Sequence, residues 1–295
     1  MIKRLLIPFI LGLTVLTGCS SQINAAPDTP QITEAVPETA ISILTEPSEI
    51  SEEFLETIEP VESELITNTH LPQSPTLSVT PGHHMLSFTD RNTKTTMKYW
   101  LFVPDNATIN MPLIVYLHGM GQIDKIHELE NVGPMLTMDS IYGNDFPFLL
   151  LYPNTPVRSW TADPIPDTLK SLIDHVAAAH QVDTNRIVIT GHSMGAVGTW
   201  NMLSRHGDYF SAAVPISCPN DGKLDFGNLA KVPIRAFVGN GGEIERNYGK
   251  GMNTIVYNTN LAGGDANLTI FYDCTHTTTP VATYTPEVFD WMLSQ

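Results

Sequence analysis

Two hydrophobic patterns alternate along residues 85–295. Nearly continuous apolar runs, such as LIVYL within 112–119, are typical of strands that are buried on both faces of a sheet. Six such runs lie at 112–119, 146–154, 185–190, 210–217, 232–239 and 266–273. Two earlier runs, at 85–90 and 94–104, alternate apolar and polar residues instead. They predict a hairpin of half-buried strands joined at Arg91-Asn92.

Four segments carry apolar residues at helical spacing, namely 167–180, 196–207, 247–264 and 285–295. Asp167 is the expected N-cap of the first helix, and Gly207 is expected to stop the second. Strands and helices in this alternation predict an α/β fold with a mostly parallel central sheet and helices on both of its faces. Sheets of this kind place their functional sites at the carboxyl ends of the strands.

The first eighteen residues have the features of a signal peptide. Lys3 and Arg4 precede an apolar run from Leu5 to Leu16 that is too short to span a bilayer comfortably. The run leads to Leu-Thr-Gly-Cys, which resembles the bacterial lipoprotein box. That resemblance implies cleavage before Cys19, lipidation of Cys19 and attachment to the extracellular face of the bacterial cell membrane. An ordinary secretory signal and a buried N-terminal helix are the alternatives.

The next stretch, 19–80, is rich in Glu, Pro, Ser and Thr. Residues 20–80 hold eleven acidic residues and no Lys or Arg. Such a chain repels itself and has little apolar area to bury, so we expect a disordered tether between the lipid and a catalytic domain at 81–295. The formal net charge of the whole chain, −16, argues against nucleic acid as a partner.

Candidate chemistry enters with the segment RIVITGHSMGAVGTW, residues 186–200. It contains G-x-S-x-G, with Ser193 between Gly191 and Gly195. The pattern alone is weak, but here a predicted strand precedes it and a predicted helix follows it. A serine on so tight a turn is exposed at the end of the sheet, and the turn leaves no room for side chains at the two glycine positions. Ser193 is therefore the candidate nucleophile.

The longer segment VDTNRIVITGHSMGAVGTW, 182–200, resembles the α/β-hydrolase superfamily, and in particular its secreted esterase and depolymerase-like branch. The resemblance covers roughly 95–295 and implies the α/β-hydrolase fold. It also implies a catalytic triad whose members follow in the order Ser, acid, His. Only His206 and His276 follow Ser193, and His206 lies about 20 Å along the predicted helix from it. His276 is therefore the expected base.

The acid is expected after the strand at 232–239. The family usually has Asp three residues after the Gly that ends this strand, and Gly242 stands there instead. Glu243 is the first choice for the acid and Glu245 the second. Asp221 and Asp225, which follow the preceding strand, stay open as alternatives.

The resemblance also implies an oxyanion hole. One backbone N–H donor is that of Met194, directly after the nucleophile. The second is that of Met120 in His118-Gly119-Met120-Gly121, where Gly119 permits the turn. Trp160 and His118 are candidate substrate-binding residues, with packing under a loop as the alternative for Trp160 and loop anchoring as the preferred role of His118.

Together these features predict an extracellular, membrane-anchored serine esterase that acts through an acyl-enzyme on small-molecule or polysaccharide-linked esters. This chemistry needs no cofactor or metal. Two alternatives remain: a prolyl-oligopeptidase-like peptidase and a catalytically inactive lipoprotein that binds surface ligands. None of the three cysteines is part of a CxxC motif. Whether Cys218 and Cys274 form a disulfide is left undecided by the sequence.

Overall fold

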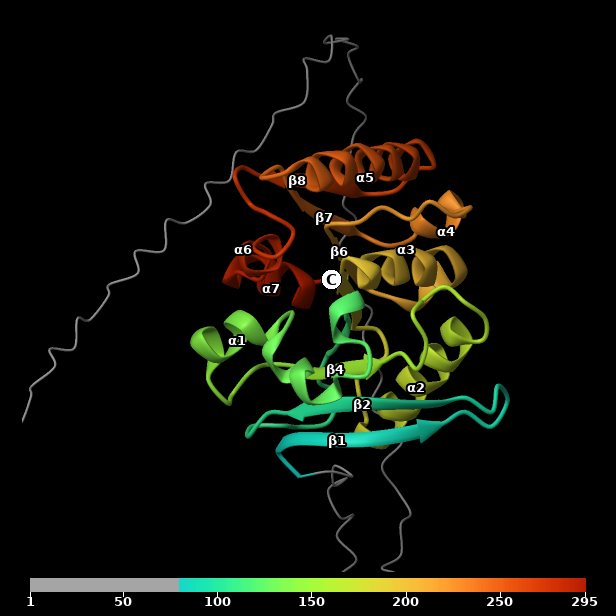
Figure 1. Ribbon diagram of the computed structural model, residues 1–295. Coiled ribbons are helices and arrows are strands. Elements are labelled where there is room, and N and C mark those ends of the chain that lie inside the picture. Colours follow the sequence, from blue (N-terminus) through green and yellow to red (C-terminus); the bar gives the residue numbers. More distant parts are fainter. Residues whose placement is uncertain (1–79) are drawn as a thin grey trace, which may run out of the picture. The chain divides into compact units, whose positions relative to one another are not determined.

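The structure is a computed structural model that describes residues 80–295, apart from the side chain of residue 130. The signal peptide 1–18, Cys19 and all but the last residue of the segment 19–80 lie outside the described residues. Eight strands form one sheet in the order β1-β2-β4-β3-β5-β6-β7-β8 (Figure 1). The strands are β1 (Gly82–Thr89), β2 (Thr96–Val103), β3 (Leu113–Leu117), β4 (Leu149–Asn154), β5 (Ile187–His192), β6 (Ala212–Ile216), β7 (Ile234–Gly239) and β8 (Ala266–Phe271).

Strands β3 to β8 run parallel to one another, whereas β2 pairs antiparallel with both β1 and β4. The predicted hairpin is confirmed, with Thr89 opposite Thr96 as its last pair. In β1 half-buried and exposed residues alternate, while every residue of β3 and β4 is buried. The hydrophobic pattern therefore separates the solvated edge of the sheet from its interior.

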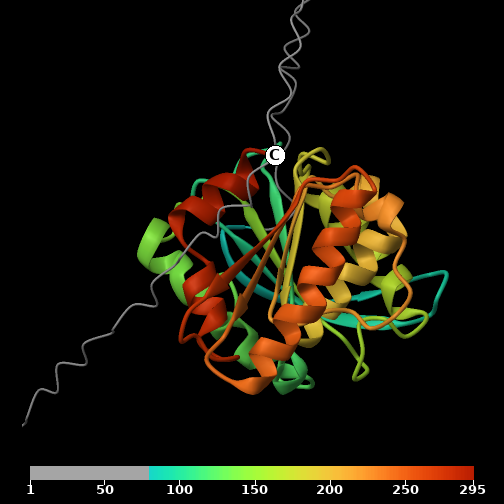
Figure 2. The same cartoon turned by 90° about the horizontal axis from the view of Figure 1, so that it is seen from above.

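The helices occupy both faces of the sheet (Figure 2). The α-helices are α1 (Met135–Tyr142), α2 (Ile165–His180), α3 (Met194–His206), α4 (Phe226–Leu229), α5 (Glu243–Leu261), α6 (Thr279–Thr283) and α7 (Pro286–Leu293). Three short 3-10 helices are η1 (Met120–Gln122), η2 (Ile126–Asn131) and η3 (Gly207–Tyr209). In the described part of the chain, no helix is both long and apolar enough to cross a bilayer.

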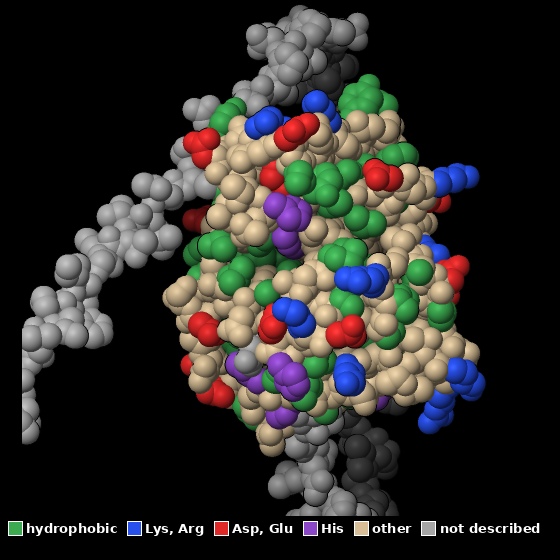
Figure 3. Space-filling view, in the orientation of Figure 1, with side chains coloured by type: hydrophobic (Ala, Val, Ile, Leu, Met, Phe, Trp, Pro, Cys, Tyr) green, Lys and Arg blue, Asp and Glu red, His purple; other side chains and the backbone are tan. Residues whose placement is uncertain are grey.

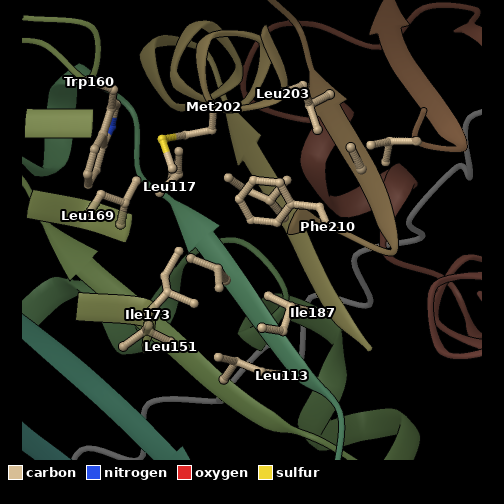
Figure 4. Packing of buried hydrophobic residues seen from close by; sticks show 14 of the residues in the cluster. Leu113, Leu117, Leu151, Trp160, Leu169, Ile173, Ile187, Met202, Leu203 and Phe210 are labelled. Atoms are coloured by element: carbon tan, nitrogen blue, oxygen red, sulfur yellow. The ribbon is translucent and has the colours of Figure 1, made fainter. Parts of the chain in front are cut away.

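Two hydrophobic cores lie against the two faces because successive strand residues point in opposite directions. Leu113 and Leu117 of β3 face α2 and α3, where they pack with Leu169 and Met202 (Figure 4). Ile114, between them in sequence, belongs to the other core, with residues of α1 and α7. The predicted mostly parallel sheet with helices on both faces is confirmed.

The first residues of two helices differ from the prediction. Helix α2 begins at Ile165, so Asp167 lies inside its first turn and is not the N-cap. Helix α5 begins at Glu243 and not at 247 as predicted. The prediction placed its start too late because the first turn is polar and shows no hydrophobic periodicity. Helix α3 ends at Gly207 as expected. The early start of α5 decides which carboxylate reaches the site.

Candidate active site

Ser193 lies on a strained turn between β5 and α3. Its φ of 59° and ψ of −120° place a residue with a side chain in a region that favours glycine. A Cβ added to Gly195 would lie 1.8 Å from the backbone oxygen of Leu117, and one added to Gly191 would lie 2.5 Å from that of Gly195. The expected lack of room at both glycines is confirmed, and close approach to β3 is its cause.

His276 reaches this serine from the loop between β8 and α6. Its Nε2 lies 2.9 Å from the Ser193 Oγ. The backbone N–H of Ser193 donates to the oxygen of Ile216 at 3.0 Å, which ties the turn to β6. The structure thus brings the predicted nucleophile and the predicted base within hydrogen-bond distance, as proton transfer between them requires.

The carboxylate beside His276 belongs to Glu245 and not to Glu243, the first choice. Glu245 Oε1 lies 2.7 Å from His276 Nδ1. Glu243 is the first residue of α5 and is exposed. Residues two apart on a helix are turned by about 200° from each other, so only one of the two can face the sheet. Asp225 caps α4, where it accepts from the backbone N–H of Asn228, and Asp221 is exposed.

The sequence does contain a signal for Glu245. It stands seven residues before Met252, a core residue of α5, and so lies on the same helix face. If the predicted helix is extended back to Glu243, the side chain of Glu245 points toward the core. The prediction treated this segment as a loop.

Glu245 is almost completely buried, with 1% of its surface exposed. Its second oxygen, Oε2, accepts hydrogen bonds from the Ser217 Oγ–H at 2.8 Å and the Gly239 N–H at 2.7 Å. Burial alone would raise the pKa of Glu245. The hydrogen bonds from His276, Gly239 and Ser217 outweigh it and hold the pKa below its ordinary value. The carboxylate is therefore ionised at neutral pH and fixed in place.

The loops that carry Glu245 and His276 are packed directly against each other. A Cβ on Gly239 would lie 2.0 Å from the backbone oxygen of Cys274, and one on Gly241 2.8 Å from the same atom. The Gly241 N–H donates to that oxygen at 2.8 Å. Glycine at these two positions permits the contact, and the contact sets the distance between the carboxylate and the imidazole.

The segment predicted to form the oxyanion hole lies beside Ser193. A Cβ added to Gly119 would be 3.5 Å from the Cβ of Ser193 and 3.4 Å from the backbone oxygen of His192. Met120 is the first residue of η1, and Met194 is the first residue of α3. Backbone N–H groups at such positions have no acceptor within their own helix. The arrangement suits an anion, but the two donor roles stay predictions.

His118 has the loop-anchoring role that the sequence favoured for it, whereas Trp160 packs under the loop and does not line a cleft, so the substrate-binding role proposed for both residues is wrong. Their exposed fractions are 0% and 1%. His118 Nδ1–H donates to the oxygen of Gly119 at 2.7 Å, and its Nε2 accepts from the backbone N–H of Thr155 at 3.3 Å. Trp160 Nε1–H donates to the oxygen of His118 at 2.9 Å. Both side chains therefore anchor the loop at 118–121 from below, and burial lowers the pKa of His118 to about 4.

Sequence reasoning missed three other residues that contact the site. Ser217, at the end of β6, holds Glu245. The rings of His192 and Tyr248 lie 4.5 Å and 5.7 Å from that of His276.

Cys218 is a free thiol, so no disulfide joins it to Cys274. Histidine and hydrophobic side chains are exposed together near the middle of the face in Figure 3. Within residues 80–295 no cluster of His, Cys, Asp or Glu is arranged to hold a metal.

A family model described as the Prolyl oligopeptidase family matches residues 157–222. The match includes Ser193 but neither Glu245 nor His276. The bifunctional acetylxylan esterase/xylanase XynS20E of Neocallimastix patriciarum is 30% identical over 124 residues, 41% of this chain and 18% of that protein. Poly(3-hydroxyalkanoate) depolymerase C of Paucimonas lemoignei is 29% identical over 130 residues, 39% of this chain and 30% of that protein. The chain thus spans less than a third of either relative.

Among solved structures, one titled as the crystal structure of a thermostable esterase is similar with a TM-score of 0.62 and 24% identity. The similarity covers 72% of this chain and 63% of that one. At this identity the likeness concerns the arrangement of the chain rather than the reaction. Together with the sheet order and the turn at Ser193, it identifies residues 80–295 as an α/β-hydrolase fold.

Proposed function

We propose that this protein is a serine hydrolase of carboxylic esters. One observation carries the proposal: a continuous hydrogen-bonded series from Ser193 Oγ through His276, at 2.9 Å, to the buried carboxylate of Glu245, at 2.7 Å. A serine hydroxyl is a weak nucleophile unless a base takes its proton, and an oriented imidazole is such a base. The names of the relatives, an acetylxylan esterase and a polyester depolymerase, support ester hydrolysis.

The geometry supports a two-step reaction. Ser193 Oγ attacks the ester carbonyl carbon while His276 Nε2 takes the hydroxyl proton. The N–H groups of Met194 and Met120 stabilise the negative oxygen of the tetrahedral intermediate. Collapse of that intermediate breaks the bond to the alcohol, which leaves with the proton of His276. Water then attacks the acyl-enzyme by the same route and releases the acid. Glu245 stabilises the imidazolium in both steps.

Turnover of p-nitrophenyl acetate tests this proposal. The wild-type protein is expected to hydrolyse the ester and to react with a fluorophosphonate probe at Ser193. Ser193→Ala is expected to lose both properties while keeping the wild-type circular dichroism spectrum. Absence of turnover together with absence of labelling in folded wild-type protein would overturn the proposal.

A peptidase of the prolyl-oligopeptidase type is the second candidate, because the family model of that name matches the segment around Ser193. The same nucleophile and base serve amide hydrolysis, so the site alone does not separate the two reactions. Cleavage of a chromogenic dipeptide without turnover of p-nitrophenyl acetate would favour it. An inactive binding protein was supported by the missing acid at Gly242, and Glu245 removes that support.

We propose further that the protein is attached to the extracellular face of the cell membrane through lipid on Cys19. The support is the sequence of residues 1–19 alone. Expression in a bacterial host should place the protein in the membrane fraction, with a lipid mass on the N-terminal Cys19 peptide. Cys19→Ser should release it. Recovery of the wild-type protein in the soluble fraction without that mass would refute the anchor.

A further inference from the structure

A cavity of about 610 Å³ lies between the middle of α3, the loop that follows β6 and the first turns of α5. We call it the Asn201 pocket. Its lining includes the polar side chains of Asn201, Asn220, Asp221, Lys223, Asn247 and Tyr248. The volume falls within the usual range for pockets that bind small molecules, roughly 300–1,000 Å³.

The Asn201 pocket adjoins the candidate active site on the side of His276. The Tyr248 ring, which lines the pocket, lies 5.7 Å from the His276 ring. Val197, in the pocket wall, donates its backbone N–H to the oxygen of Ser193 at 3.2 Å. Cys218 lines the pocket and directly follows Ser217, which holds Glu245. A group bonded to a reacting ester therefore has a short path into this pocket.

The position of His276 decides which part of an ester enters the pocket. The leaving alcohol oxygen receives its proton from His276 Nε2, so it must lie within hydrogen-bond distance of that atom. The oxygen that becomes negative lies instead at the N–H groups of Met194 and Met120, beside Gly119. The alcohol portion is thus directed toward His276 and Tyr248, which is the side of the Asn201 pocket.

The lining of the pocket indicates what kind of alcohol it takes. Asparagine amides, a tyrosine hydroxyl, a carboxylate and an ammonium group offer both donors and acceptors of hydrogen bonds. The Asn201 Oδ1 is buried and has no hydrogen-bond partner among the described residues. By contrast, the Asn220 amide is already engaged, with Nδ2 donating to the oxygen of Val197 at 3.2 Å and Oδ1 accepting from the Gly222 N–H at 2.7 Å.

A buried acceptor without a partner favours a ligand that brings a donor, and it disfavours a hydrocarbon chain. We propose that the Asn201 pocket binds the alcohol portion of the ester and selects a hydroxyl-bearing alcohol such as a sugar unit. A hydroxyl of that alcohol donates to Asn201 Oδ1. Asn247 and Tyr248 contribute further polar contacts at the opening toward His276. This inference rests on the proposed esterase activity.

Two acetate esters with the same acyl group test the selection: a mono-acetylated methyl glucoside and hexyl acetate. The ratio of their kcat/KM values isolates the alcohol portion. Asn201→Leu and Asn247→Leu are each expected to lower the ratio of sugar ester to alkyl ester, by about 10-fold for Asn201. Asn253→Leu makes the same exchange on α5 outside the pocket and should leave the ratio unchanged.

An unchanged ratio in Asn201→Leu, with Ser193-dependent turnover of p-nitrophenyl acetate retained, would overturn the inference and leave the esterase proposal standing. Absence of any ester turnover by the wild-type protein would defeat the esterase proposal itself. These two failures are therefore distinguishable. An equal loss on both esters would assign Asn201 a general structural role and also overturn the inference.

Cys218 provides a measurement that needs no turnover. It is a free, half-buried thiol in the pocket wall, and burial raises its pKa to about 11. In Ser193→Ala protein at alkaline pH, the mono-acetylated glucoside should slow alkylation of Cys218 by iodoacetamide, measured by mass spectrometry of the Cys218 peptide. Hexyl acetate at the same concentration should protect less. Equal protection, or none by the glucoside, would contradict the assignment.

Discussion

Ser193 and Glu245 approach His276 from two regions that are built in different ways. Around Ser193, the backbone is forced against β3, and contacts as close as 1.8 Å for an added Cβ leave no freedom at Gly195. Around Glu245, segments at the ends of β6, β7 and β8 meet through hydrogen bonds to one carboxylate, from Ser217, Gly239, His276 and Thr279. Steric exclusion fixes the backbone in the first region, and polar contacts fix the carboxylate in the second. Substitutions in the first region should therefore lower mainly the stability, and those in the second mainly kcat.

The largest effect is expected from Gly195→Ala. The new Cβ would overlap the Leu117 oxygen, which belongs to a fully buried strand and cannot move without disturbing the sheet. We expect a loss of unfolding free energy of about 4 kcal/mol or more, measured by urea denaturation. Gly249→Ala on α5 is the matched control, because its Cβ would lie 3.5 Å from Val238 and helix interiors favour alanine. Comparable losses in both variants would refute the steric account.

The second largest effect is expected from Glu245→Gln. The amide cannot stabilise the imidazolium and presents a donor where His276 and Gly239 also donate. We expect kcat for p-nitrophenyl acetate to fall by about 10²–10⁴-fold. Glu243→Gln, two residues away on the exposed side of α5, should change kcat by less than about twofold. Loss of activity only in Glu243→Gln would show that the observed contact is not the functional one.

The two regions should also respond to acid in different pH windows. Burial lowers the pKa of His118 from 6.5 to about 4. The unfolded chain therefore binds a proton that the folded chain excludes, and stability falls as pH falls from about 6.5 to about 4. The pKa of Glu245 is lowered below 4.5, so its contribution is fully present above 4.5 and is lost as pH falls through the lowered value.

Urea unfolding at pH 7 and pH 4.5 separates these contributions. In His118→Gln the difference in unfolding free energy between the two pH values should shrink by up to about 2.4 kcal/mol. His192, whose pKa is also lowered to about 4 by burial, keeps part of the dependence. Glu245→Gln should keep the wild-type dependence over this interval. An unchanged dependence in His118→Gln would mean that His118 does not stay neutral in the folded protein.

The same contrast explains which parts of the molecule could be predicted from sequence. The strands β3 to β8 and the turn at Ser193 follow from short-range patterns, because burial on both faces and a strand-to-helix turn leave local marks. His276 could be predicted as the base because only His206 and His276 follow Ser193 in the chain, and His206 lies too far along α3. The choice between Glu243 and Glu245 depends on where α5 begins, which a polar first turn conceals.

Trp160 and His118 illustrate the other limit. The family resemblance suggested that Trp160 contacts substrate, but the orientation of both side chains depends on how the loop at 118–121 folds over them. A buried indole needs an acceptor for its N–H, and the His118 oxygen is that acceptor. Hydrogen bonds between segments so far apart in sequence leave no periodic signal, so sequence reasoning could not decide between a supporting and a binding role for Trp160.

The smallest effect is expected from Ser217→Ala, which tests whether the polar half of the site tolerates the loss of one contact. The variant removes the 2.8 Å hydrogen bond to Glu245 Oε2 but leaves those from Gly239, Thr279 and His276. One fewer donor raises the pKa of Glu245 and holds its carboxylate less firmly beside His276, so kcat at pH 7 should fall by about 10-fold or less. Ser211→Ala, directly before β6 and at the opposite end of that strand from Ser217, should leave kcat unchanged. A fall as large as that of Glu245→Gln would instead mean that the four donors act as one cooperative unit, so that the second region is as intolerant of change as the turn at Ser193.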